Sequence, residues 1–180
     1  MSRSELGLFS YEILGLVGRG GAGPHDLRAM VRRGRILDWA GESQYYVEPK
    51  RLARLGYLEA RKERGRTRER TVYTLTDKGV QALRDWAASA ARFTPVKSEP
   101  LVRLLIADLV GEAPTRTGLS ALRGEVADLR GRLDEAEASA ATLPHREKYL
   151  RLVVGFLRQL LDLHLELVER VERELGRPGQ

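Results

Sequence analysis

The sequence contains no cysteine, and this absence excludes disulfides, thiol catalysis and cysteine-bound metal centres. Histidine is scarce as well, and neither a second histidine nor a pair of carboxylates is placed to complete a metal site around His164. No segment has the roughly 20 uninterrupted apolar residues of a membrane span, and the first residues lack the apolar core of a signal peptide. No arrangement of a nucleophile and a base stands out, so we expect a protein that is not an enzyme and binds no cofactor or metal. Without a membrane span or a signal peptide, we expect it to be cytoplasmic and to bind no membrane.

Charged residues, in contrast, are abundant and unevenly distributed. Residues 1–92 hold 18 basic and 11 acidic side chains, a net charge of +7, whereas residues 93–180 hold 13 and 14, a net charge of −1. A chain of 180 residues corresponds to one or two domains. The charge asymmetry therefore predicts two domains, residues 1–92 and 93–180, of which the first binds a polyanion and the second has another partner.

Three helices are predicted in the first 56 residues. Apolar residues spaced by three and four indicate the first over residues 4–17, and several glycines follow it. Pro24 suits the first turn of a second helix that ends near Gly34. Ser43 is a good N-cap for a third helix, which Gly56 ends. The chain therefore begins with short helices joined by turns.

Two strands and a fourth helix complete the first domain. Residues 57–60 and 71–75 are predicted strands, the second because of its β-branched and aromatic content. The loop between them, residues 61–70, carries six basic and two acidic residues, and Thr76 caps the helix that follows. This order of elements is that of a winged helix-turn-helix. We therefore expect a mainly α fold with a small β-hairpin wing.

The third helix is predicted to expose a face that contacts DNA. The second helix of a helix-turn-helix enters the major groove, where glutamine pairs with adenine edges and lysine or arginine with guanine edges or phosphates. With Tyr45, Leu52 and Leu55 facing inward, the outward residues are Gln44, Tyr46, Val47, Lys50, Arg51 and Arg54. The basic face of this helix and the basic hairpin loop both belong to one predicted DNA-binding arrangement. A basic surface that only contacts water is therefore the weaker interpretation.

Pro49 conflicts with a regular third helix. A proline past the first turn removes a backbone N–H and clashes with the carbonyl four residues earlier, at a cost of about 3 kcal/mol. The sequence therefore predicts either a kink at Pro49 or a helix that starts later than Ser43.

A competing motif, Gly18-Arg19-Gly20-Gly21-Ala22-Gly23, fits the glycine pattern of dinucleotide-binding folds, and Asp38 lies 20 residues beyond its first glycine. That pattern requires a preceding strand and a series of parallel strands. Residues 6–17 instead have helical spacing, and no such series follows. We therefore interpret the glycines as a turn between two helices.

The second half is predicted to be helical. After a linker over residues 91–100, a short apolar helix covers residues 101–110, and two long helices follow, the first closed by Pro144. The last helix carries two apolar stripes, although one stripe is enough to pack a helix on one neighbour. We assign the first stripe to dimerisation: Leu150, Val154, Leu157, Leu161, His164, Val168 and Val171. A second stripe comprises Val153, Leu160, Leu163 and Leu167, so we expect a helical hairpin whose last helix also packs against another copy of the chain.

Three runs of the first half resemble the PadR family of bacterial transcriptional regulators: residues 44–52 (QYYVEPKRL), 55–58 (LGYL) and 73–79 (YTLTDKG). The resemblance covers residues 5–90. It implies an N-terminal winged helix domain, a helical C-terminal region that makes the dimer, and a function as a repressor of nearby genes, in some members released by phenolic acids or hydrophobic drugs. It also implies that Tyr46, Lys50 and Arg51 contact DNA and that Arg64–Arg70 form the wing.

These observations predict a dimeric repressor on a palindromic operator of double-stranded DNA, with half-sites about one helical turn or more apart. The expected DNA contacts are Ser43, Gln44, Tyr46, Lys50, Arg51, Arg54, Arg64, Arg66, Arg68 and Arg70. Resemblance to the drug-responsive branch of the family makes Trp86, with Tyr149 and Phe156, a candidate contact for a small apolar or aromatic effector; packing of Trp86 without a ligand explains it equally well. The alternative function is a protein-interaction adaptor that uses the winged helix as a scaffold and its coiled-coil-like helices as the working surface.

Overall fold

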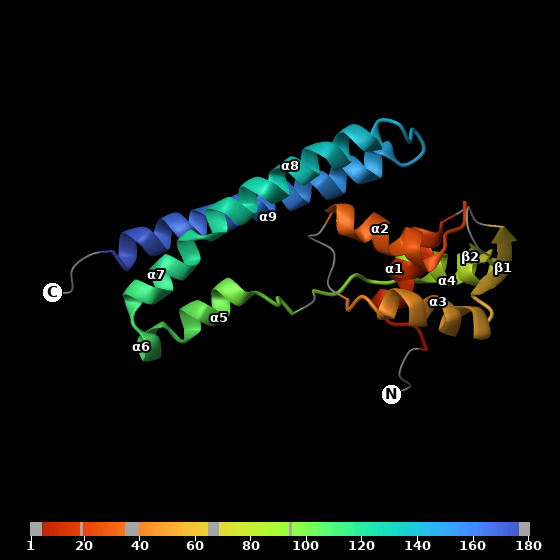
Figure 1. Ribbon diagram of the computed structural model, residues 1–180, viewed down its shortest axis with the longest axis horizontal. Helices are drawn as coiled ribbons and strands as arrows, with labels where there is room; N and C mark the ends of the chain where they lie inside the picture. Colours follow the sequence, from red (N-terminus) through yellow and green to blue (C-terminus); the bar gives the residue numbers. More distant parts are fainter. Residues whose placement is uncertain (1–4, 19, 35–39, 65–68, 94, 177–180) are drawn as a thin grey trace. The chain divides into compact units, whose positions relative to one another are not determined.

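The structure, a computed structural model, describes residues 5–18, 20–34, 40–64, 69–93 and 95–176 (Figure 1). The chain divides into two compact units, residues 1–92 and 93–180. The first unit contains α1 (Leu8–Val17), α2 (Pro24–Gly34), α3 (Gln44–Arg54), β1 (Leu58–Arg64), β2 (Glu69–Leu75) and α4 (Asp77–Ala88). The second contains α5 (Glu99–Leu105), α6 (Ala107–Val110), α7 (Glu112–Ser120), α8 (Leu122–Ala140) and α9 (Glu147–Glu174). The predicted fold class, mainly α with one β-hairpin, is confirmed.

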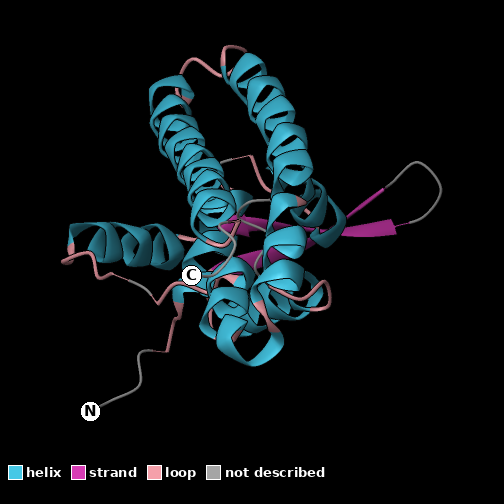
Figure 2. Ribbon diagram, turned by 90° about the vertical axis from the view of Figure 1, so that its left-hand side faces the viewer, coloured by secondary structure: helices cyan, strands magenta, loops and turns pink. Residues whose placement is uncertain are grey.

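The two strands are longer than the sequence predicted. They pair antiparallel from Leu58 opposite Leu75 to Arg64 opposite Glu69 (Figure 2). Most of the expected basic loop is therefore strand, and residues 65–68 lie outside the described residues. The prediction was wrong because charged residues have weak strand preference alone but stabilise a ladder when opposite charges meet across it. Here the side chains of Lys62 and Glu69 lie 3.5 Å apart.

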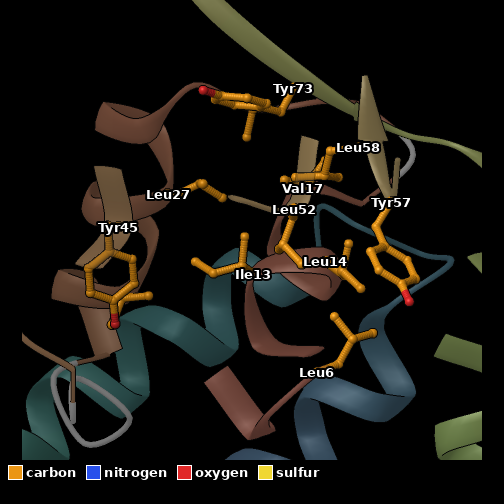
Figure 3. Packing of buried hydrophobic residues seen from close by; sticks show 12 residues of the cluster. Leu6, Ile13, Leu14, Val17, Leu27, Tyr45, Leu52, Tyr57, Leu58 and Tyr73 are labelled. Atoms are coloured by element: carbon orange, nitrogen blue, oxygen red, sulfur yellow. The ribbon is translucent and has the colours of Figure 1, made fainter. Parts of the chain in front are cut away.

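The core of the first unit forms where α1, α2 and α3 meet the hairpin. Ile13, Leu14, Leu27 and Leu52 are fully buried, and their side chains gather at the centre of the cluster (Figure 3). The Tyr45 ring is equally buried, with the Phe9 ring packed edge-on against it at 5.2 Å between centroids. These buried positions recur at helical spacing, so this inward face leaves the opposite face of α3 to solvent.

The run from residue 73 to 79 has a structural role, because it closes the end of α3. The Thr76 hydroxyl donates to the Gly56 carbonyl at 2.7 Å and accepts from the Gly79 N–H at 3.1 Å, as a helix N-cap does. The Lys78 ammonium donates to the Leu55 carbonyl at 2.7 Å. Carbonyls left without partners at the end of a helix are thereby satisfied. At Gly79 a Cβ atom would lie 2.2 Å from the Tyr57 carbonyl oxygen, so the close packing of α4 requires glycine there.

The third helix begins at Gln44, directly after Ser43, and contains Pro49 within it. Of the two alternatives that Pro49 raised, a later helix start is therefore wrong. The Pro49 ring is fully buried, and its apolar contacts offset part of the lost backbone hydrogen bond.

In the second unit, two predicted helices are each divided. The segment expected as one helix over residues 101–110 consists of α5 and α6, which meet at Ile106. The first long helix is similarly split into α7 and α8 at Ala121. The periodicity of apolar residues continues across both breaks, which explains why the sequence alone predicted continuous helices.

Helices α8 and α9 form an antiparallel hairpin and lie side by side along their length (Figure 1). Ion pairs flank the seam and match its register: Arg123 reaches Glu172 at 2.6 Å, and Arg158 reaches Glu137 at 2.7 Å. The seam buries the stripe that the sequence assigned to dimerisation, since Val154, Leu157, Leu161, Val168 and Val171 are 7% exposed or less within one chain. That assignment needs correction, because these side chains already pack inside the hairpin and are not available to a second copy.

Candidate nucleic-acid interface

The outer face of α3 presents polar and basic side chains to solvent. Its exposed residues, together with the N-cap Ser43, are Gln44, Tyr46, Val47, Lys50 and Arg54. Tyr46 is 38% and Val47 61% exposed, which is unusual for side chains of this size. Neither Lys50 nor Arg54 forms an ion pair with another described residue. The face therefore combines hydrogen-bonding, apolar and cationic groups, as base edges and phosphates require.

Arg51 differs from the other residues expected to contact DNA. Its guanidinium donates from Nε to Glu48 Oε2 at 2.8 Å and from Nη2 to Glu48 Oε1 at 2.7 Å. It also donates to the Ser10 hydroxyl at 3.1 Å and to the Glu5 carbonyl at 3.2 Å. The paired carboxylate raises the pKa of Arg51, and hydrogen bonds from Arg51 and Ser10 lower the pKa of Glu48 against the opposing effect of burial. Arg51 thus lies in an internal network beside α1, apart from the exposed face.

The basic residues of the hairpin are partly neutralised. Arg70 lies 3.5 Å from Asp26 of α2 and 3.6 Å from Glu63, and Arg61 lies 3.0 Å from Glu59. Arg64, at the end of β1, has no acidic partner within the described part of the chain. The two expected contacts Arg66 and Arg68 belong to residues 65–68, outside the described residues. Among the described residues of the hairpin, the positive charge without an acidic partner thus lies at Arg64, where β1 ends.

Comparison with known proteins shows which regulators the chain resembles. No family model matches the chain. The chain is 28% identical over 143 residues to the negative transcriptional regulator PadR of Bacillus subtilis, covering 74% of this chain and 77% of the relative. The crystal structure of Bacillus subtilis PadR with operator DNA superposes with a TM-score of 0.75 at 25% identity, covering 94% of this chain and 98% of the other. The chain is therefore similar to PadR transcriptional regulators over most of its length.

The chain thus resembles DNA-binding transcriptional regulators, and PadR regulators are not enzymes. A second solved structure, Bacillus subtilis PadR in complex with p-coumaric acid, has a TM-score of 0.69 at 21% identity and covers 98% of this chain and all of the other. Among the described residues, no group of histidine and carboxylate side chains is placed to hold a metal ion. None of the described helices has both the length and the apolar character that spanning a membrane requires.

The glycine run of this chain is part of the winged-helix packing. Its flanking element α1 is a helix, and Ala22 exchanges two backbone hydrogen bonds with Tyr73 of β2, both at 3.0 Å. Gly21 has a φ of +75°, and a Cβ atom there would lie 3.0 Å from the Tyr73 carbonyl oxygen. Glycine is therefore needed for a close approach to the hairpin and not for a cofactor. Asp38, the other half of the competing motif, is outside the described residues.

The candidate effector contacts fall in different units. Trp86, 43% exposed on α4, stacks on Tyr11 of α1 with ring centroids 4.6 Å apart and planes 7° from parallel. Tyr149 and Phe156 lie on α9 and are 57% and 65% exposed. Other residues of α1, β2 and α4, among them Leu14 and Leu83, line an apolar hollow of about 340 Å³. Sequence reasoning missed Tyr11, a partly buried residue of α1 that packs against the core cluster.

Proposed function

We propose that the protein is a dimeric repressor that binds a palindromic operator and is released by a small aromatic effector. The observation that carries the proposal is the exposed face of α3. Gln44, Tyr46, Lys50 and Arg54 project from a helix whose opposite side is locked into the core, so they form a rigid reading surface. The basic residues of the hairpin supply backbone contacts beside the groove. The similarity to a PadR protein solved with operator DNA supports this arrangement over the adaptor alternative.

A two-fold dimer is supported by apolar surface that one chain leaves uncovered. On α9, side chains spaced by three and four residues face solvent beside the hairpin seam; Val153 is 43%, Phe156 65% and Leu163 59% exposed. On α5 and α6, Leu105 and Leu109 are 78% and 80% exposed. Contiguous apolar patches of this kind mark protein interfaces. We assign the second stripe of α9, together with α5 and α6, to contact with a second copy of the chain, in place of the stripe buried in the hairpin.

The proposed repression, and its release by an aromatic effector, are supported by the similarity to Bacillus subtilis PadR and by aromatic and apolar surface in the first unit. The named relative is a negative regulator, and its structure has been solved with p-coumaric acid. In this chain the half-exposed Trp86 of the stacked pair with Tyr11 offers a flat aromatic ring a π-face, and the apolar hollow lined by α1, β2 and α4 offers apolar contacts. An effector bound there would act by favouring a dimer whose two α3 helices no longer match the operator spacing.

The proposal is tested by selecting DNA duplexes from a randomised library with the purified protein, followed by footprinting. We expect a palindromic sequence with two protected half-sites, and repression of a reporter that carries it. A sequence without two-fold symmetry would contradict the dimeric arrangement, and activation of the reporter would contradict repression.

Effector binding is measured with p-coumaric acid as the probe. It should quench the fluorescence of Trp86 and release the selected duplex. A Trp39→Phe variant, which leaves Trp86 as the remaining tryptophan, should keep the quenching, whereas Trp86→Phe should lose it. Release of DNA that persists unchanged in Trp86→Phe would move the effector site elsewhere.

A further inference from the structure

We propose that Arg51 is a positioning residue, which fixes the orientation of α3 from inside the domain, and that it does not contact DNA. The inference rests on the proposed reading role of α3. Family resemblance places Arg51 among the DNA contacts, and it follows Lys50 directly on the same helix. The contacts of its guanidinium point to the other role.

The donors of Arg51 are almost fully used within the first unit. A guanidinium has five N–H donors in a fixed fork. Two of them meet both oxygens of Glu48, one meets the Ser10 hydroxyl and one meets the Glu5 carbonyl. The single remaining N–H cannot make the bidentate contact by which arginine reads guanine or grips a phosphate. Binding DNA through Arg51 would therefore require breaking a preorganised ion pair.

The partners of Arg51 tie α3 to two other parts of the domain. Ser10 is 3% exposed on α1; its hydroxyl donates to Glu48 at 2.7 Å and accepts from Arg51 and from the Gly7 N–H, so both its acceptor positions and its donor are used. Glu5 precedes α1, and its carboxylate accepts from the Tyr57 hydroxyl at 2.8 Å. The network thus joins the start of α1, the middle of α3 and the beginning of the hairpin.

This network fixes the rotation of α3 about its own axis. Glu48 and Arg51 occupy the side of the helix between the apolar inner face and the exposed outer face, where their hydrogen bonds add directional contacts to the non-directional apolar packing. Because charge-assisted bidentate hydrogen bonds are directional, they hold the helix at one angle. A change in that angle displaces Gln44 and Tyr46 from the base edges but leaves the flexible cationic side chains close to phosphates. Loss of the network should therefore reduce specific binding much more than nonspecific binding.

The test compares Arg51→Met with Arg54→Met, a matched control on the exposed face of the same helix. Affinities are measured by fluorescence anisotropy against the selected duplex and an unrelated duplex, over a series of salt concentrations. If each Arg54 contacts one phosphate, Arg54→Met lowers the slope of log K against log salt by about 1.8 per dimer, since each lost contact contributes about 0.9. Arg51→Met should leave that slope unchanged and lower the ratio of specific to nonspecific affinity by about tenfold, the discrimination of one base contact. A loss of slope in Arg51→Met equal to that in Arg54→Met would overturn the inference.

Two further variants keep the test decisive if Arg51→Met is poorly folded. Glu48→Gln removes a negative charge near DNA. If Arg51 contacted DNA, this variant should bind more tightly, because Arg51 would be free to bind a phosphate. The positioning role instead predicts a lower ratio of specific to nonspecific affinity and an unchanged slope of log K against log salt. Arg51→Lys keeps the charge but not the fork, and should behave like Arg51→Met. Full specificity in Arg51→Lys, or a steeper slope in Glu48→Gln, would contradict the positioning role. If the wild-type protein selects no duplex at all, the reading role of α3 fails, and the inference with it.

Discussion

Replacing Leu163 with glutamate should dissociate the dimer. Leu163 is 59% exposed in one chain, on the second stripe of α9. Full burial of a leucine side chain contributes about 1.5–3 kcal/mol, so covering the exposed share contributes about 1–2 kcal/mol per subunit. In a two-fold interface the same contact occurs twice, which gives about 2–4 kcal/mol per dimer. This corresponds to a rise in the dimer dissociation constant of about 30- to 1000-fold, before the cost of burying the new charge is added.

The assay is sedimentation equilibrium over a range of protein concentrations. The matched control is Ala138→Glu, which adds the same charge at an exposed position of α8, on the side of that helix opposite the buried Leu133 and Ala140. We expect the control to dimerise like the wild-type protein, and both variants to keep the helical circular dichroism signal. The reasoning would be refuted by a Leu163→Glu protein that dimerises with wild-type affinity, or by a wild-type protein that is monomeric at every concentration.

Three other substitutions test separate parts of the structure. Gly79→Ala should destabilise the first unit by about 1–3 kcal/mol in urea unfolding, as overpacking does. The control Gly15→Ala should not destabilise it, because a Cβ atom at Gly15 meets no atom within 4 Å. Equal stability of the two variants would argue against the close contact of Gly79 with Tyr57. Lys50→Met should lower the salt slope of DNA binding by about 1.8 per dimer, and an unchanged slope would remove Lys50 from the phosphate contacts. The folded-state pKa of Glu48 is lowered from 4.5, so the stability that its charge contributes is present above that value and is lost as the pH falls through the folded pKa. The difference in unfolding free energy between wild type and Glu48→Gln should therefore shrink in acid. A difference that stays constant with pH would contradict the ion pair.

Most helices of the first unit could be predicted from the sequence because their signals are local. Pro24 marks the start of α2, Ser43 directly precedes α3, and Thr76 caps α4 with a hydrogen bond that its position in the sequence already suggested. The glycines after α1 were correctly interpreted as a turn. Each of these features depends on residues within a few positions of one another, so one sequence is sufficient to find them.

The strand lengths and the role of Arg51 depend on contacts between distant residues. The hairpin extends beyond the predicted strands because charged residues such as Lys62 and Glu69 meet across it, which the propensity of either residue alone does not indicate. Arg51 falls on the outward side of α3 by helical spacing, but its partner Ser10 is 41 positions away in the chain. Two signals of this network were available in the sequence. Ser10 is a polar residue beside the apolar positions of the first helix, and Glu48 and Arg51 carry opposite charges three positions apart.

The choice between the two stripes of α9 shows why charge must be considered together with apolar pattern. Both stripes have the same spacing, so hydrophobicity alone does not say which one stays inside the chain. The seam with α8 is flanked by pairs such as Arg123 with Glu172 and Arg158 with Asp134, which join the two helices of one subunit. Pairs of opposite charge across the seam are in keeping with the near-zero net charge of residues 93–180. The stripe that carries Leu163 is then left for a second copy, and the surplus positive charge of the first unit is left for DNA.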